Sequence, residues 1–232
     1  MGTFTRDRPK TLLNLDGVTL LEKQLQSIRK CGVIDKVIYV LGYMADVFEE
    51  KLKILDCDSA ITVFNPFYDV SNNLISLWFA KYYMDIDFAI TNGDNLFQAE
   101  ILRDLSFNRN GIYLTVHKKD KYDNDDMKVT LKDSRVHKVS KLIDEADAAF
   151  ESVGLAMVSG KSYREKFKIT IERMVRSKDY LDKYWLEVFN TLAREKVAIR
   201  PFQIEDGWQE FDYHHDVEEF LKYKGNGPGK TD

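Results

Sequence analysis

The sequence predicts an α/β protein whose sheet is doubly wound, mostly parallel and extended by antiparallel strands. In the first two-thirds of the 232 residues, helical and strand patterns alternate, and helices of about a dozen residues between strands are typical of parallel crossovers. Later in the chain, apolar residues alternate at period two, as in antiparallel strands. Neither a repeat nor a linker interrupts the pattern, so we expect one domain over 1–224 and a flexible glycine-rich tail over 225–232.

The first predicted helix covers residues 18–32. Thr19 and Glu22 have the spacing of a capping box, and Gly32 stands where a helix end is expected. One face carries Leu20, Leu21, Gln24, Leu25 and Ile28. No strand pattern precedes this helix, although a parallel α/β fold places a strand there. The sequence therefore indicates that an element before the helix is missing.

The other elements follow in chain order. The strands predicted in the first half lie at 36–42, 60–65 and 86–94, and the helices between them at 45–55 and 71–84. The antiparallel strands are predicted at 111–119, 127–133 and 135–141, with a turn at 132–134. The last elements are helices at 162–177 and 180–195, a strand at 197–205, and a turn and a helix within 208–223.

The composition is that of a soluble protein, with 44% hydrophobic and 31% charged residues. The net charge of −4 argues against a general nucleic-acid binder, and no apolar run approaches the ~18 residues of a membrane span. Cys31 and Cys57 lie among apolar neighbours without metal-type spacing, which favours reduced thiols. We expect a cytoplasmic protein, monomeric or homodimeric, that binds neither nucleic acid nor membranes.

The stretch "GTFTRDRPK" combines a glycine, two threonines and several cations near the start of the chain. Backbone N–H groups at Gly2 and Thr3 suit a phosphate, because glycine allows a close approach. Arg6, Arg8 and Lys10 would donate charge-assisted hydrogen bonds to the same anion. A solvated basic terminus is the other explanation of these residues.

Two acidic motifs are candidates for a metal site. In "AITNGDNLF", an apolar strand ends in a turn that presents Asp94 at the edge where open α/β sheets bind ligands, and a carboxylate there suits Mg²⁺. In "GWQEFDYHHD", Glu210 and Asp212 alternate on a short strand and share a face, so that one of them can meet Asp94. An ordinary turn and a polar edge strand are the alternatives. His214 and His215 fit the surface.

Aromatic and amide side chains are the remaining pocket candidates. Tyr184 and Trp185 in "DKYW" would contact a cationic or sugar-like ligand through cation–π or stacking contacts. Core packing is the more common role for aromatic residues at helical spacing. The polar candidates are Asn72 and Asn73 in "VSNN", and Asp126 with Lys128 on one side of a strand in "NDDMKV".

Taken in order, these segments resemble the nucleotidyltransferase family that activates phosphorylated small molecules. "RPKTLLNLDGVTLLEKQLQSIRKCGVIDKVIYVLGY" is similar to that family's opening after its glycine-rich loop. "NPFYDVSNNLISLWFA", "NGDNLF", "DKYW" and "EFDYHHDVEEF" are most similar to the phosphocholine cytidylyltransferase branch. The resemblance covers nearly the whole chain. It implies a Rossmann-like doubly wound mixed sheet, the GT-A-like nucleotidyltransferase fold.

The resemblance also implies a reaction, the transfer of CMP from CTP to a small phosphorylated acceptor with release of pyrophosphate. Mg²⁺ would be held by Asp94 and Asp212, and Lys10 and Arg6 would be the catalytic cations. The residues implied at the nucleotide are Gly2, Thr3, Arg6, Lys10, Gly93 and Asp94. Such catalysis depends on positioning and electrostatics. This agrees with a sequence that has no Ser/His/Asp arrangement, Walker sequence or Cys/His metal cluster.

The chain departs from the family pattern at its start. The family's opening strand is absent, and Phe4 stands where the family has an arginine, so Arg6 is the candidate replacement. Loss of a central strand would leave buried backbone groups unpaired, at about 1–3 kcal/mol for each. We therefore expect the natural protein to have residues upstream of Met1, or this chain to be poorly stable and weakly active.

The resemblance implies an acceptor site, whose residues are Asn72, Asn73, Asp126, Glu151, Tyr184 and Trp185. Glu151 lies in "FESVG", which resembles a stretch lining that site. Asp126 and Met127 stand where the choline-binding branch has an aromatic residue, and an acidic residue suits a primary ammonium. 2-Aminoethylphosphonate is therefore a rival to phosphocholine.

Other activities are open at this point. They are a sugar-1-phosphate nucleotidyltransferase using UTP, dTTP or GTP, a nucleotide-sugar glycosyltransferase of similar fold, and a truncated or non-catalytic nucleotide-binding domain.

Overall fold

The expected α/β class is confirmed in the computed structural model, which describes residues 8–106, 110–212 and 216–220. The α-helices are α1 (Leu20–Cys31), α2 (Ala45–Ile54), α3 (Asn73–Phe79), α4 (Ala99–Ser106), α5 (Lys161–Met174) and α6 (Glu187–Arg194). The 3₁₀ helices are η1 (Lys10–Leu12), η2 (Ala80–Tyr83), η3 (Glu145–Asp147) and η4 (Lys178–Tyr180).

The strands are short except for those at the centre of the sheet. In the first half they are β1 (Asn14–Leu15), β2 (Val18–Thr19), β3 (Val37–Leu41), β4 (Ala60–Phe64), β5 (Phe88–Thr91) and β6 (Asn95–Phe97). In the second half they are β7 (Gly111–His117), β8 (Lys128–Lys132), β9 (Arg135–Ser140), β10 (Phe150–Ser159), β11 (Ile199–Ile204) and β12 (Trp208–Glu210).

Helix α1 begins and ends where the sequence predicts. The N–H of Glu22 donates to Oγ1 of Thr19, and the N–H of Thr19 donates back to the Glu22 carboxylate at 2.9 Å, which completes the capping box. Gly32 ends the helix with φ 70°. A hairpin of β1 and β2, which the sequence analysis did not predict, precedes the helix. Its turn is Asp16-Gly17, a pair that tight hairpin turns favour because both residues accept positive φ.

The sheet is mixed, with more antiparallel pairing than the alternation of helices and strands predicts. Its six-stranded part has the order β11-β7-β10-β8-β9, and β5 also pairs with β10. β7 and β11 are parallel, whereas β10 runs antiparallel to β5, β7 and β8. β3 and β4 form a separate parallel pair. The antiparallel excess arises because β10 lies between β5 and β7 and runs against both.

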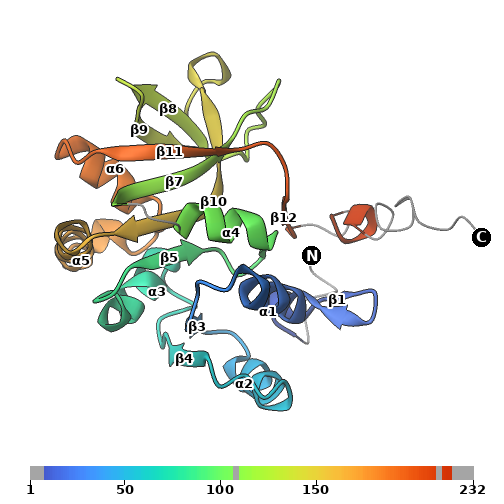
Figure 1. Cartoon of the computed structure of the whole chain (residues 1–232). Helices are drawn as coiled ribbons and strands as arrows, with labels where there is room; N and C mark the ends of the chain where they lie inside the picture. Colours follow the sequence, from blue (N-terminus) through green and yellow to red (C-terminus); the bar gives the residue numbers. More distant parts are fainter. Residues whose placement is uncertain (1–7, 107–109, 213–215, 221–232) are drawn as a thin grey trace, which may run out of the picture.

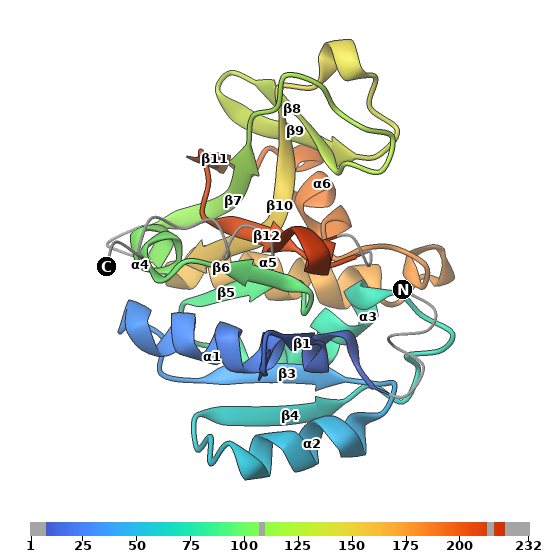
Figure 2. The same cartoon turned by 90° about the vertical axis from the view of Figure 1, so that its right-hand side faces the viewer.

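Helices cover both faces of the six-stranded sheet (Figure 1). Successive residues of β10 point to opposite faces. Ala156 and Val158 join the apolar cluster formed with α3, α5 and α6, and Leu155 and Met157 join the cluster formed with α4. In Figure 2, the β8–β9 hairpin lies at one end of the molecule and α2 with β3 and β4 at the other. The doubly covered sheet of the prediction is therefore present.

The helix predicted at 180–195 forms only in its second half. α6 begins at Glu187, and residues 181–186 are not helical. The reason is tertiary: the N–H of Trp185, which a helix would bond to the carbonyl of Leu181, donates instead to Oδ1 of Asn73 at 2.8 Å. The carbonyl of Leu181 accepts from the N–H of Asn72, at the start of α3, at 2.7 Å.

The C-terminal elements and the two cysteines can also be compared with the predictions. The last helix is present at 216–220, whereas His214, His215 and 225–232 lie outside the described residues. Cys31 is buried, Cys57 is half-buried, and both are free thiols. In the described part of the chain, no helix has the length and apolar character needed to cross a membrane.

Gly154 forms a bulge in β10 where the register with β7 shifts. Its φ is 68°, in the left-handed region. A Cβ at this position would lie 2.5 Å from Nδ2 of Asn95 and 2.7 Å from Nδ2 of Asn92. The glycine therefore lets two asparagine side chains approach the backbone, one on each side of Asp94 in the sequence.

We expect Gly154→Ala to lower the free energy of unfolding by about 3 kcal/mol, because it combines left-handed strain with displacement of both asparagines. Urea denaturation measures the loss. Gly32→Ala is the matched control, since Gly32 has nearly the same φ but nothing within 4 Å of an added Cβ, and it should lose about 1 kcal/mol. Equal losses in the two variants would mean that the close approach is not what requires a glycine in β10.

Candidate active site

A turn between β5 and β6 carries Asp94 to the carboxyl end of β5, as the sequence predicts. β6 pairs with β12 in a register that sets Asn95 opposite Glu210. Directly after β12, the N–H of Phe211 donates to the carbonyl of Asp94 at 3.1 Å. The pairing of these two three-residue strands therefore brings Glu210 and Asp212 beside Asp94.

Gln24 of α1 holds this turn in place. Its Nε2 donates to the carbonyl of Gly93 at 2.8 Å and to the carbonyl of Asn95 at 2.7 Å. Gln24 lies on the face of α1 that the sequence predicts to be mostly apolar, and no role was predicted for it. An amide on an otherwise apolar face was the available signal, because a side-chain amide that faces the protein requires hydrogen-bond partners.

Three carboxylates meet at the turn. One oxygen each of Asp94, Glu210 and Asp212 lies within 4.8 Å of the other two. Lys10, on η1, reaches the same point, with its Nζ 2.7 Å from Oδ1 of Asp212 and 3.3 Å from Oδ2 of Asp94. Oδ1 of Asp94 is buried and has no hydrogen-bond partner within the described ranges. The cluster therefore holds more negative charge than the Lys10 ammonium neutralises.

Burial and mutual repulsion disfavour the charged carboxylates. Burial, together with the charges of Asp94 and Asp212, raises the pKa of Glu210 to about 7. Burial also raises the pKa of Asp94, against the opposing effect of Lys10. Burial lowers the pKa of Lys10, but its bonds to the two aspartates outweigh this, and the net shift is upward. A divalent cation would relieve the repulsion, and carboxylate oxygens are the ligands that Mg²⁺ prefers. The donor set and the unpartnered oxygen of Asp94 thus fit Mg²⁺.

The structure brings together three of the residues implied at the nucleotide. η1 carries Lys10 to the Gly93–Asp94 turn. Outside the described residues lie Gly2, Thr3 and Arg6, and their contact with a nucleotide stays a prediction.

The "SNN" and "DKYW" segments, distant in sequence, meet at the start of α3. Nδ2 of Asn72 donates to the carbonyl of Asp182 at 3.2 Å, and the N–H of Trp185 donates to Oδ1 of Asn73 at 2.8 Å. Both amides therefore serve to fix the DKYW turn. Their expected contact with an acceptor stays a prediction.

Trp185 packs in the core and offers little surface to a ligand. It is 3% exposed, and its ring lies 5.5 Å from that of Phe189. This geometry corresponds to the core-packing alternative rather than to a stacking platform. Its Nε1 donates to Oδ1 of Asn92 at 2.7 Å. Trp185 thus positions the side chain of Asn92, two residues before Asp94 in the sequence.

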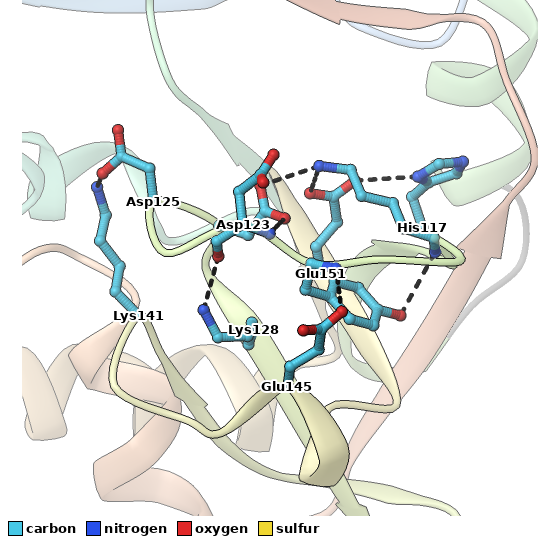
Figure 3. A network of polar contacts seen from close by, with 10 residues as sticks. His117, Asp123, Asp125, Lys128, Lys141, Glu145 and Glu151 are labelled. Carbon is cyan, nitrogen blue, oxygen red and sulfur yellow. Dashed lines mark hydrogen bonds and ion pairs between the residues drawn. The ribbon is translucent and has the colours of Figure 1, made fainter.

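A second polar network is formed around Glu151 (Figure 3). The Glu151 side chain, 4% exposed, lies 3.0 Å from Nδ1 of His117 and 2.7 Å from Nζ of Lys119. Lys119 also pairs with Asp126 at 2.9 Å. The ring of His117 lies 6.1 Å from that of Trp208 in β12, and Nδ2 of Asn95 donates to the carbonyl of Val153 in β10 at 2.8 Å, which places the network near the metal-ligand candidates. The structure thus brings Asp126 and Glu151 together, joined by a lysine that the sequence analysis did not single out.

Lys141 and Asp125 form the other end of this network (Figure 3). Their ion pair measures 2.5 Å, and Nζ of Lys141 lies 5.8 Å from the ring of Tyr184, which is 45% exposed. The pKa of Lys141 is raised by its bond to Asp125, with further effects from Tyr184 and Asp212. Tyr184 immediately precedes Trp185, whose Nε1 binds Asn92 next to the Gly93–Asp94 turn.

Lys128 does not join Asp126 on an open pocket wall, contrary to the expectation from "NDDMKV". Asp126 lies in the bend before β8, so the two residues do not share a strand. Lys128 is buried, and its Nζ donates to the carbonyl of Asp123 at 2.8 Å. Its role is to fix the loop that carries Asp126.

Comparisons with solved structures identify the fold. The chain is similar to a CTP:phosphocholine cytidylyltransferase from Streptococcus pneumoniae, with TM-score 0.77, 18% identity, and 96% of this chain and 92% of that chain covered. It is also similar to an inositol-1-phosphate CTP transferase from T. maritima, with TM-score 0.75, 23% identity and coverage of 97% and 91%. A candidate glucose-1-phosphate thymidylyltransferase from Bacillus anthracis gives TM-score 0.76, 11% identity and coverage of 100% and 92%. The chain has the GT-A-like nucleotidyltransferase fold.

Sequence comparison gives a curated relative that spans most of the chain. No family model matches the chain. Among curated proteins it is 26% identical over 185 residues to the choline-phosphate cytidylyltransferase of Streptococcus pneumoniae (strain ATCC BAA-255 / R6), a match that covers 78% of this chain and 74% of that protein. The expected resemblance to nucleotidyltransferases is therefore confirmed, and the relatives support a nucleotidyltransferase enzyme.

We expect the metal-free protein to lose stability between about pH 4.5 and pH 7. The folded-state pKa of Glu210, about 7, lies above the ordinary value of 4.5, so between these values the folded state binds more protons than the unfolded state. The stabilisation is therefore fully present below about pH 4.5, falls across this window and is lost as pH rises through about 7. Thermal unfolding in a chelator measures the trend.

Glu210→Gln should lessen this fall in melting temperature, because glutamine stays neutral throughout. Glu205→Gln, at an exposed site in the neighbouring turn, is the control and should leave the trend unchanged. If wild type and Glu210→Gln lose the same number of degrees, Glu210 is not the titrating group.

Proposed function

We propose that this chain is a Mg²⁺-dependent cytidylyltransferase that transfers CMP from CTP to a small phosphorylated or phosphonate acceptor and releases pyrophosphate. The proposal rests on one observation above all, the cluster of Asp94, Glu210 and Asp212 around Lys10 at the end of β5. The names of the relatives favour CTP, since they include a choline-phosphate cytidylyltransferase and an inositol-1-phosphate CTP transferase.

The residues at the turn have separate roles in this proposal. Asp94 and Asp212, with Glu210 as a third ligand, would hold Mg²⁺, which when bound stabilises the negative charge of the triphosphate. Lys10 supplies a further positive charge at the same point. The residues proposed along the triphosphate, on the family resemblance, are Gly2, Thr3, Arg6 and Gly93.

The proposed reaction is a single in-line displacement. An anionic oxygen of the acceptor attacks the α-phosphorus of CTP, and a new P–O bond forms. The bond from the α-phosphorus to the oxygen that bridges to the β-phosphorus breaks, and pyrophosphate leaves with its electron pair. The attacking oxygen is already deprotonated, so the chain needs no nucleophile or general base. Its residues position the reactants and stabilise charge.

On the family resemblance, the acceptor would enter on the side of Asp126, Glu151 and Tyr184. Two contacts support this side: His117, which is bonded to Glu151, lies 6.1 Å from Trp208 of β12, and Trp185, next to Tyr184, binds Asn92. Asn72, Asn73 and Trp185 would shape this side through the DKYW turn. Phosphocholine, from the name of the curated relative, and 2-aminoethylphosphonate are the first two acceptors to test.

Asp94→Asn should reduce pyrophosphate release from CTP and acceptor by roughly 10²-fold or more, because it removes a charged metal ligand. A coupled pyrophosphate assay measures the loss, and a chelator should reproduce it in the wild type. Asp206→Asn, in the exposed turn before β12, is the control and should keep full activity. If Asp94→Asn keeps most of the activity, the metal assignment is wrong.

The choice of nucleotide can be tested independently of the acceptor. With Mg²⁺ present, CTP should raise the melting temperature more than UTP, dTTP or GTP does. Stabilisation by UTP or dTTP without CTP would instead favour a sugar-1-phosphate nucleotidyltransferase, the alternative suggested by the Bacillus anthracis structure. A glycosyltransferase would release no pyrophosphate from any of these mixtures.

A further inference from the structure

We infer that Trp185 is a positioning residue for the candidate metal site. Through Asn92, its indole N–H holds the turn of residues 92–95, which carries Asp94. The inference rests on the metal site of the proposed function. It assigns Trp185 to the metal side of the site, whereas the family resemblance implies contact with the acceptor.

The middle and the end of this turn are held through their backbone. Nε2 of Gln24 in α1 donates to the carbonyls of Gly93 and Asn95, at 2.8 and 2.7 Å. From the end of β12, the N–H of Phe211 donates to the carbonyl of Asp94 at 3.1 Å. The first residue of the turn is left to other contacts.

Asn92, the first residue of the turn, is held through its backbone and its side chain. Its N–H donates to the carbonyl of Gly154 at 3.2 Å. Its side chain lies against the same glycine, where an added Cβ would come within 2.7 Å of Nδ2. Oδ1 of Asn92 accepts from Nε1 of Trp185 at 2.7 Å. The indole and the bulge of β10 together therefore fix this side chain.

Trp185 is a rigid donor to this side chain. It is 3% exposed, and its ring lies 5.5 Å from that of Phe189. Its backbone N–H donates to Oδ1 of Asn73 at 2.8 Å, which fixes the start of the side chain as well. An indole has one polar atom, which only donates, and a buried donor needs an acceptor. The bond to Asn92 therefore satisfies Trp185 as much as it restrains the turn.

The carboxylate cluster makes such a restraint necessary. One oxygen each of Asp94, Glu210 and Asp212 lies within 4.8 Å of the other two, and Oδ1 of Asp94 is buried without a partner in the described part of the chain. Mutual repulsion favours any movement of the turn that separates these groups. A turn released at Asn92 can move in this way, and a cation would then have to draw its ligands together again before it binds.

The first test removes the indole N–H and measures cation binding directly. Trp185→Phe keeps an aromatic ring against Phe189, and it should weaken the binding of Mn²⁺ to the nucleotide-free chain by about tenfold, measured by electron paramagnetic resonance. The Mg²⁺ concentration for half-maximal pyrophosphate release should rise by a similar factor, while the KM of the acceptor at saturating Mg²⁺ should stay within about twofold. Trp78→Phe, at a half-buried position of α3, is the matched control and should leave Mn²⁺ binding unchanged.

The outcomes separate this inference from the proposed function. Unchanged Mn²⁺ affinity in a folded Trp185→Phe variant overturns the inference and leaves the proposed function standing. A higher acceptor KM with unchanged Mn²⁺ affinity also overturns it, because Trp185 would then serve the acceptor. If the wild type binds Mn²⁺ but releases no pyrophosphate with any acceptor, the proposed function falls, and Mn²⁺ binding still decides the role of Trp185. A wild type that binds no Mn²⁺ overturns both.

The second test breaks the same hydrogen bond from its other end, and it decides the question if Trp185→Phe fails to fold. Asn92→Ala removes the accepting oxygen and keeps the indole, so it should also weaken Mn²⁺ binding by about tenfold. Adding Trp185→Phe should then cost less than about a further twofold, because both substitutions break one bond. Unchanged Mn²⁺ binding in Asn92→Ala, or losses that multiply in the double variant, overturns the inference.

Discussion

The antiparallel pairing of β6 with β12 holds together groups that repel one another. It places Glu210 opposite Asn95 and binds the N–H of Phe211 to the carbonyl of Asp94, so that three carboxylates meet within 4.8 Å. Backbone hydrogen bonds do not depend on the charge of the side chains, and they keep this geometry while the pKa of Glu210 rises to about 7. The strain of the cluster is electrostatic, and a bound cation is the natural means of relieving it.

Several elements support the turn that carries Asp94, and each does so with an uncharged group. Gln24 of α1 binds its backbone, and Trp185 of the DKYW turn orients Asn92. Gly154 lets the side chains of Asn92 and Asn95 approach β10. Neutral supports leave the charge of the site to its carboxylates and to Lys10. A reaction that depends on positioning and charge stabilisation benefits from a turn held in this way.

The carboxylate cluster around Asp94 and the network of Glu151 and Asp126 differ in how many of their carboxylate oxygens have hydrogen-bond partners. Asp94 keeps a buried oxygen without a partner in the described part of the chain, whereas each carboxylate oxygen of Glu151 and Asp126 has one. A carboxylate oxygen without a partner can bind a cation directly, whereas a paired oxygen must first give up its partner. This difference separates the candidate metal site from the network around Glu151, although both are built from carboxylates and a lysine.

Sequence patterns were sufficient to predict the structure wherever residues close together in the chain decide it. The capping box at Thr19, the end of α1 at Gly32 and the position of Asp94 after an apolar strand all depend on residues a few positions apart. Such features follow from backbone geometry and from hydrogen bonds within one turn or strand. The resemblance to nucleotidyltransferases also rests on motifs of this kind, read in their order along the chain.

Tertiary structure decided what depends on distant contacts. Residues 181–186 have a helical pattern but are not helical, because the side chain of Asn73 accepts the N–H of Trp185 that a helix would use. Lys119 joins Asp126 to Glu151 only because the folded sheet brings the loop between β7 and β8 to β10. No local pattern encodes such a meeting, since the free energy that selects it comes from burial and from pairing between elements. The sequence by itself therefore determined the class of the fold and which carboxylates to examine. Only the folded chain decided which of those carboxylates remain available to a cation.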